Sequence, residues 1–387
     1  MIVRLPVALV LFLCLVAWGQ SGRAGEAGFP AVQDDLDSDS LRQAIQRSLQ
    51  YLEKLPPDRM VGEWPRKVTA GEIKEALVFF SSKLDLFDRP EALGDAIRSG
   101  FDLHEARGRD GLGDMLVTGY YQPILEGALT RTGEFRYPIY GKPKDLVESE
   151  MVTLGGQAQA EKLIGRLNGE ELVPYYSRHE IDGMGTLKNK GYEIAWAKDP
   201  IDVFFLHVQG SGILRLRDGS TLAVGYAGSN GRPYRSIGRV LIDRGKIPPE
   251  EVTMQRLRQY LRERPEERDE ILAQNESYIF FRFLSEGPLG SLEVPLTPGR
   301  SIATDPRIFP KGALALLVSH KPVFNVQGQL LKWEPFARFV LNQDTGSAIK
   351  GEGRVDLFFG AGELAGQSAG VMKSSGKLFF FLGKERR

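Results

Sequence analysis

Apolar residues recur at helical spacing in the first third of the chain. One stripe runs through residues 41–55, a second through 73–84, and a third follows Pro90. Ser40 and Thr69 each stand three positions before a Gln or Glu, which is the pattern of a capping box, and proline suits the first turn of a helix. The pattern therefore predicts three helices, beginning near Ser40, Thr69 and Pro90, whose apolar faces belong to a core.

The pattern then changes to short apolar runs separated by turn residues, which is typical of strands. These runs cover 115–121, 194–197, 203–208, 213–217, 221–224, 301–303, 313–318, 336–341 and 377–382. Asp-Gly-Ser at 218–220 separates two of them and is a hairpin signal. Helical spacing returns between Ser236 and Gly245 and again from Thr253, with an interruption at Pro265. Periodicity alone thus predicts an α+β protein, mainly β after residue 115.

The N-terminus has the pattern of a secretory signal. Arg4 precedes an apolar run over residues 5–18, which is too short for a membrane-spanning helix, and small residues follow. We predict a signal peptide over residues 1–24, with cleavage after Ala24. An uncleaved N-terminal anchor is the alternative. Residues 25–39 are small and acidic, and we interpret them as a linker.

Composition argues against several kinds of site and partner. A chain of 387 residues is long enough for two domains, and its 50 basic and 50 acidic residues argue against binding a nucleic acid through its phosphates. The single cysteine, Cys14, lies in the predicted signal peptide, so the mature chain is expected to have no disulfide. Four scattered histidines do not form a zinc motif. We therefore expect no metal and no cofactor.

The candidate chemistry lies in aspartates near the C-terminus. Asp356 interrupts the strand-like apolar run 355–359, and Asp344 opens a turn of small residues. Loss of hydration in such a run raises the pKa of a carboxyl group, which suits a general acid. The alternative is that Asp356 caps a turn or pairs with Arg354. Asp305, before a proline, has the pattern of a turn residue.

Asp344 also opens an Asp-Thr-Gly sequence, as in the active-site turn of aspartic proteases. A pepsin-like chain of this length should contain a second copy, and none is present. Asn342 and Gln343 are moreover polar where that family has apolar residues. This reading is therefore disfavoured.

Several motifs occur together in a specific order. They are DP at 305–306, DTGSAIKG at 344–351 and DLFFG at 356–360, preceded by GYYQP at 119–123, RYPIY at 136–140, VQGSG at 208–212, YRSIG at 234–238 and QNxS at 274–277. Together they cover about two thirds of the chain, from Leu116 onward. The set resembles the membrane-bound lytic murein transglycosylase A family, with its C-terminal three-aspartate domain.

The resemblance implies a fold. It implies a double-psi β-barrel formed by residues 40–123 and 288–387, with a second β domain, residues 124–287, inserted between the two parts. A substrate groove would then lie between the two domains.

The resemblance also implies a reaction. The family cleaves the β-1,4 bond between N-acetylmuramic acid and N-acetylglucosamine of peptidoglycan without water, and the muramyl C6 hydroxyl closes onto C1 to give a 1,6-anhydro product. Asp356 matches the catalytic position, acting first as acid and then as base. Asp344 and Asp305 match supporting positions that orient Asp356, bond backbone amides or stabilise positive charge. Their alternative role is to stabilise turns.

A glycan groove needs flat apolar faces for sugar rings and polar groups for their edges. The expected substrate-binding residues are Tyr120, Tyr121, Gln209, Ser211, Asn230, Tyr234 and Lys350. Tyr121 and Gln209 are the strongest of these candidates, and for Lys350 a solvated side chain is the alternative. The expected partners are peptidoglycan glycan strands and, further, wall synthases or other wall enzymes. We expect a monomer.

The best-known members of the family are outer-membrane lipoproteins. Around Cys14, however, bulky residues occupy the positions where a lipid-attachment signal has small ones. We therefore expect a periplasmic protein without a lipid anchor, and association with the outer membrane is the alternative. A non-catalytic wall-binding or wall-loosening module and a conventional hydrolase are the remaining alternatives.

Overall fold

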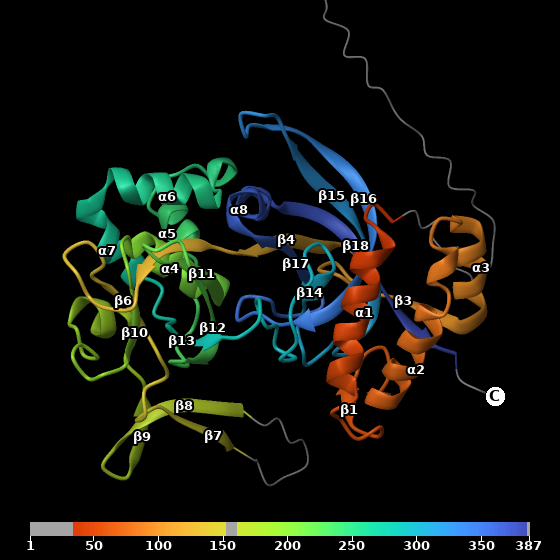
Figure 1. Cartoon of the computed structure of the whole chain (residues 1–387), viewed down its shortest axis with the longest axis horizontal. Helices are drawn as coiled ribbons and strands as arrows, with labels where there is room; N and C mark the ends of the chain where they lie inside the picture. Colours follow the sequence, from red (N-terminus) through yellow and green to blue (C-terminus); the bar gives the residue numbers. More distant parts are fainter. Residues whose placement is uncertain (1–33, 152–160, 385–387) are drawn as a thin grey trace, which may run out of the picture. The chain divides into compact units, whose positions relative to one another are not determined.

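A closed β-barrel forms the first of two large sheet structures (Figure 1). This computed structural model describes residues 34–151 and 161–384. Six strands follow the order β15-β16-β14-β17-β4-β18, and β18 pairs with β15 to close the barrel, while β3 extends it at β18. The strands are β3 (Phe101–Glu105), β4 (Met115–Gln122), β14 (Ser301–Ala303), β15 (Leu314–Phe324), β16 (Leu330–Asp344), β17 (Arg354–Ala361) and β18 (Lys373–Gly383).

The second sheet has six strands in the order β13-β12-β11-β5-β10-β6. They are β5 (Ile124–Ala128), β6 (Tyr137–Tyr140), β10 (Glu193–Ala197), β11 (Ser211–Arg215), β12 (Thr221–Ser229) and β13 (Ile279–Leu284). Four helices accompany it: α4 (Pro200–Gln209), α5 (Ile237–Asp243), α6 (Met254–Glu263) and α7 (Pro265–Ala273). Leu125, Leu206 and Leu214 are fully buried between α4 and this sheet. The chain thus leaves the barrel after β4 and returns to it at β14. The domain boundaries that the resemblance implies stay a prediction.

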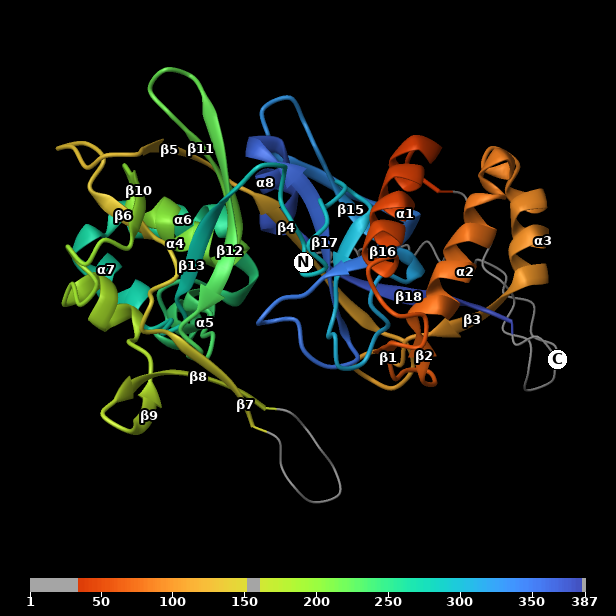
Figure 2. The same ribbon diagram turned by 60° about the horizontal axis from the view of Figure 1, so that its bottom comes forward.

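Smaller elements complete the fold (Figure 2). β7 (Val147–Met151), β8 (Glu161–Asn168) and β9 (Glu171–Pro174) form a separate three-stranded sheet, and β1 (Met60–Gly62) pairs with β2 (Val68–Thr69). The other helices are α1 (Ser38–Leu52), α2 (Ala70–Ser81), α3 (Pro90–Gly100), α8 (Gly362–Val371), the short 3-10 turns η1 (Leu84–Leu86) and η3 (Pro249–Glu251), and the π-turn η2 (His179–Gly183). Within residues 34–151 and 161–384, no helix has the length and apolar character needed to cross a bilayer.

The three predicted N-terminal helices are confirmed. The predicted box at Thr69 is also correct, since Thr69 and Glu72 bond each other's backbone amides at the start of α2. The box predicted at Ser40 is wrong. α1 begins two residues earlier, because the Asp37 carboxylate accepts the Ser40 amide at 2.7 Å and so caps the helix.

The end of the predicted linker is held against the barrel. Asp34 pairs with Arg300 at 2.6 Å, and both side chains are almost fully buried. Asp35 pairs with Arg338 and Lys321. These ion pairs anchor the segment that begins at Asp34 to the barrel. The sequence suggested a solvated acidic linker, because it does not show that barrel arginines lie next to these aspartates. The predicted signal peptide, its cleavage site and Cys14 lie outside the described residues.

The strand predicted at 203–208 is wrong, because this segment lies in helix α4. Asp199 caps the helix by accepting the Ile201 amide, Pro200 occupies its first turn, and Gly210 ends it at φ 78°. Periodicity cannot distinguish a strand from a buried helix when a short run consists entirely of apolar residues. Here the capping residues on either side of the run indicate the helix. The other predicted strands and helices are confirmed.

Candidate active site

Two of the three predicted aspartates lie in one row across the barrel. Ala303 of β14 is paired with Asp344 of β16 on one side and with Asp356 of β17 on the other. Asp356 is in turn paired with Thr118 of β4, and Thr118 with Lys373 of β18. Residues in register on neighbouring strands point to the same face of a sheet. The fold therefore gathers two carboxylates, a hydroxyl and an amine from strands that are far apart in sequence.

Among the residues that the structure describes, Asp356 has one direct side-chain hydrogen bond. The Thr118 hydroxyl donates to its Oδ1 at 2.7 Å, and Arg354 Nη2 donates to Thr118 Oγ1 at 3.3 Å. Burial raises the pKa of Asp356, while the Thr118 bond and the Arg354 charge lower it and the Asp344 charge raises it, with a net value of about 6. A carboxyl group with this pKa is partly protonated near neutral pH, so it can both donate and accept a proton.

Asp344 is surrounded by donors. The Tyr120 hydroxyl donates to its Oδ2 at 2.9 Å, while the amides of Ser291 and Thr345 donate to its Oδ1 at 2.9 and 2.8 Å. Burial nevertheless raises the pKa of Asp344 to about 6. Tyr120 packs its ring against Phe358 at a centroid distance of 5.2 Å, which fixes the hydroxyl. Tyr120 thus holds Asp344 and is a candidate positioning residue.

Asp305 is fully buried and has a different environment. Its carboxylate accepts hydrogen bonds from the Arg307 guanidinium at 2.7 and 3.0 Å and from the Gly351 amide at 2.8 Å. Burial raises its pKa, but these bonds outweigh the effect and hold the pKa at about 2. Asp305 is therefore charged, and it ties the loop between β16 and β17 to the end of β14. Among the supporting roles expected for it, the bonding of backbone amides agrees with these contacts.

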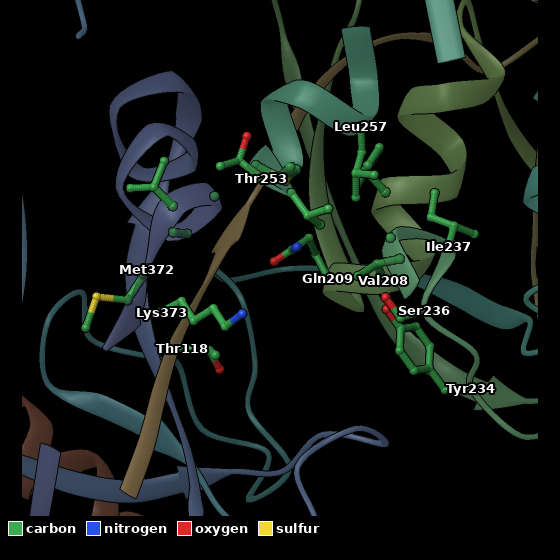
Figure 3. A pocket seen from close by; sticks show the side chains of 18 of the residues that line it. Thr118, Val208, Gln209, Tyr234, Ser236, Ile237, Thr253, Leu257, Met372 and Lys373 are labelled. Atoms are coloured by element: carbon green, nitrogen blue, oxygen red, sulfur yellow. The ribbon is translucent and has the colours of Figure 1, made fainter. Parts of the chain in front are cut away.

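A pocket of about 340 Å³ opens beside this row (Figure 3). Its barrel side includes Thr118, Arg354 and Lys373, and its other side includes Gln209 and Tyr234. In Figure 3 Thr118, Met372 and Lys373 face Gln209, Ser236 and Tyr234 across the opening. Burial raises the pKa of Tyr234, and the charge of Asp356 adds to this effect, so the two groups lie within electrostatic range. Gln209 and Tyr234 are thus brought to the site.

Two predicted substrate-binding residues, Tyr121 and Asn230, are buried in the structure. Tyr121 is only 6% exposed and packs against Ala365 and Ala369, since its strand turns this side chain under α8. Its amide donates to Gln209 Oε1 at 3.0 Å. Asn230 is 1% exposed, and its side chain forms hydrogen bonds with backbone groups, including one from the Tyr278 amide at 2.8 Å. Both side chains therefore make their contacts within the protein in this structure.

Ser211 and Lys350 also lie away from the pocket lining. Ser211 is half-buried on β11, and Lys350 is exposed in the loop before β17. Conversely, the sequence interpretation missed Thr118, Arg354 and Lys373 as members of the site. Strand alternation could have placed Thr118 on the same face as Tyr120, two positions later. No local signal identifies Lys373, because its place depends on the pairing of β18 with β4. Among the described residues no group of three His, Cys, Asp or Glu side chains could hold a metal.

Comparison with known proteins gives consistent matches. Residues 116–282 match the MltA specific insert domain, and residues 300–382 match the 3D domain. The chain is 37% identical over 287 residues to membrane-bound lytic murein transglycosylase A of Escherichia coli K12, covering 72% of this chain and 69% of that protein. It is 32% identical to the same-named protein of Vibrio cholerae, covering 72% and 68%.

Solved structures with a similar fold belong to the same family of proteins as the sequence matches. The crystal structure of a membrane-bound lytic murein transglycosylase from Agrobacterium tumefaciens is 33% identical, with a TM-score of 0.73 and coverage of 91% of this chain and 94% of that one. Crystalline E. coli MltA with bound chitohexaose is 28% identical, with a TM-score of 0.67 and coverage of 88% and 89%. The predicted family and the barrel with its inserted sheet are thus confirmed, and the chain belongs to the membrane-bound lytic murein transglycosylase A family.

Proposed function

We propose that the protein is a periplasmic lytic transglycosylase that cleaves the bond between N-acetylmuramic acid and N-acetylglucosamine in peptidoglycan and releases 1,6-anhydromuropeptides. The observation that carries the proposal is the environment of Asp356, a carboxyl group of pKa about 6 on the barrel face beside the pocket. Family membership and the chitohexaose bound by E. coli MltA support a glycan as the ligand.

The proposed reaction uses Asp356 twice. Protonated Asp356 donates its proton to the glycosidic oxygen as the bond to C1 breaks. The resulting carboxylate then accepts the proton of the muramyl C6 hydroxyl as that oxygen bonds to C1. Because the nucleophile belongs to the substrate, no second carboxylate is needed to attack C1, in contrast to retaining glycosidases.

The neighbouring groups support this cycle. Thr118 orients Asp356 through the 2.7 Å hydrogen bond. The negative charge of Asp344 favours the protonated form of Asp356 before cleavage. Gln209, Tyr234 and Lys373 line the pocket and are the proposed contacts to the sugar rings.

Digestion of purified peptidoglycan, followed by mass analysis of the soluble products, tests the proposal. Wild type should release 1,6-anhydro products without reducing muramyl ends, and Asp356→Asn should lose two to four orders of magnitude of activity, roughly the contribution of a general acid or base. Asp58→Asn, at an exposed position, is the matched control. Reducing-end products would show a hydrolase instead, and near-wild-type turnover by Asp356→Asn would remove Asp356 from the reaction.

A further inference from the structure

A second pocket of about 670 Å³ lies in the inserted part of the chain. Its walls come from β6, the π-turn η2, the start of α4 and the end of α7. Phe204 of α4 lines both this pocket and the one beside Asp356. We refer to it as the α4 pocket. Its size is that of a site for a small molecule or a short peptide.

Two arginines at the α4 pocket are arranged as anion receptors. The Arg131 guanidinium lies 5.7 Å from the centre of the Trp196 ring, and that of Arg136 lies 5.3 Å from the Tyr137 ring. Stacking on an aromatic face holds a guanidinium in a fixed plane and leaves N–H groups at its edge for a carboxylate. In Arg136 one of these groups, Nη2, donates to the Tyr137 hydroxyl at 3.2 Å, and the others are left for a ligand. Neither arginine, nor Lys188 on the same lining, has a carboxylate partner within the described residues.

An acidic group is built into the same pocket. Asp182 Oδ1 accepts the Tyr278 hydroxyl at 2.9 Å, and Oδ2 lies 3.4 Å from Arg178 Nη1. Arg178 is itself buried, and two of its nitrogens donate to the backbone carbonyls of Asn275 and Ser277. The Asp182 side chain stays 44% exposed, although burial among protein groups raises its pKa. It is therefore a rigidly held acceptor that faces open space within a concave site.

The local backbone is also specialised. Asp182 lies in η2, where the Met184 amide bonds the His179 carbonyl at 3.0 Å and closes a π-turn. Such turns are frequently found at functional sites. Gly183 and Gly185 follow on the pocket lining, and a Cβ atom on Gly183 would come within 3.0 Å of the His179 ring, so this turn requires a glycine beside Asp182.

We propose that the α4 pocket binds the peptide stem of peptidoglycan, with the stem's carboxylates on Arg131 and Arg136 and its free amino group on Asp182. This inference rests on the proposed function. A neutral glycan fits less well, because the two arginines cover the aromatic faces on which sugar rings would stack. A peptide with two or more carboxylates and one amine matches the charges of both kinds of group.

The spacing of the two pockets suits one substrate. Pro200 lines the α4 pocket and Gln209 lines the pocket beside Asp356, at opposite ends of the same helix. Nine residues of helix span about 14 Å at 1.5 Å per residue. An extended peptide of four residues also spans about 14 Å. A stem attached to a muramyl unit near Asp356 is therefore long enough to reach the α4 pocket.

Calorimetry with the full chain tests this. The probe is N-acetyl-Ala-γ-Glu-diaminopimelyl-Ala, whose acetyl group imitates the link to the sugar and whose only amine is that of the diamino acid. The double variant Arg131→Gln/Arg136→Gln should bind at least about tenfold more weakly, as expected for the loss of charge-assisted hydrogen bonds. Asp182→Asn should also weaken binding. Arg215→Gln, an exposed arginine of the same sheet that pairs with Glu126, should bind like wild type.

Cleavage assays provide the second measurement. The double variant should lose kcat/KM several-fold on stem-bearing strands and keep the wild-type value on strands stripped of peptide. Absence of peptide binding to wild type, or equal binding to the double variant, overturns the proposal, as does displacement of the peptide by a chitooligosaccharide. Failure of the proposed function would appear differently, as the absence of anhydro products from both kinds of strand.

Discussion

The Thr118 hydroxyl donates a 2.7 Å hydrogen bond to Oδ1 of Asp356, although 238 residues separate them in sequence. The parallel pairing of β4 with β17 places the two residues opposite each other. This bond orients the carboxyl group and also stabilises its charged form, so Thr118 controls both the geometry and the proton affinity of the proposed acid.

Replacement of Thr118 by valine keeps the shape and removes the hydroxyl. Because the lost bond lowers the pKa of Asp356, that pKa should rise above about 6, and the fall in activity at high pH should move to higher pH. The turnover number should drop about tenfold, as expected for one oriented hydrogen bond. A pH–rate profile measures both effects. Thr221→Val, at an exposed position at the start of β12, is the control, and an unmoved profile in Thr118→Val would contradict the assignment.

Asp356→Asn should stabilise the folded protein at high pH. The pKa of Asp356 is raised from 3.8 to about 6 on folding, so ionisation of this group opposes folding. The destabilisation is absent below pH 4, grows between pH 4 and 6 and is complete above pH 6. The variant should therefore exceed wild type in free energy of unfolding by about 3 kcal/mol at pH 8 and equal it at pH 4. Urea denaturation at the two pH values checks this, and an equal difference at both would be inconsistent with it.

Asp344→Asn removes a negative charge that raises the pKa of Asp356. That pKa should fall, so activity should begin to decline at a lower pH than in wild type. The loss of activity at the optimum should be smaller than that of Asp356→Asn, because Asp344 acts through its neighbour. If Asp344→Asn loses as much activity as Asp356→Asn without a shift of the profile, Asp344 instead acts directly on the substrate.

Asp305→Asn should destabilise the protein most at neutral pH. The pKa of Asp305 is about 2 in the folded state, below the usual 3.8, so its charge favours folding above pH 4 and this contribution is lost as the pH falls through 2. We expect a loss of about 1–2 kcal/mol at pH 7, since the exposed Arg307 partner weakens the ion pair. Chemical denaturation at pH 7 and pH 3 measures it. A larger loss at pH 3 than at pH 7 would contradict the expected sign.

Tyr121→Ala should mainly reduce stability, whereas Gln209→Ala should mainly reduce glycan affinity. Tyr121 is buried under α8, so its truncation should cost about 3 kcal/mol of stability or more. Gln209 lines the pocket, so its truncation should weaken binding of a chitooligosaccharide by about 1–2 kcal/mol with a smaller effect on folding. Thermal unfolding and calorimetry separate the two. If Tyr121→Ala is stable but binds glycan more weakly, Tyr121 contacts the substrate after all.

The sequence by itself determined the elements whose signals are local. Helical stripes with proline or a capping box predicted α2 and α3, and alternating or continuous apolar runs predicted most strands of the barrel. The apolar run around Asp356 likewise predicted a raised pKa, and in the structure burial of the carboxyl group raises it. Family motifs added the aspartates and the order of the domains.

Only the tertiary structure decided which side chains share the site. The row of Asp344, Asp356, Thr118 and Lys373 depends on strand pairings between distant segments, which local periodicity does not encode. Tyr120 and Tyr121 are adjacent tyrosines, yet one holds Asp344 and the other lies in the core, since successive residues of a strand point to opposite faces. The face of β4 that is buried is the one on which another element packs. Here that element is helix α8, which lies more than 200 residues later in the sequence.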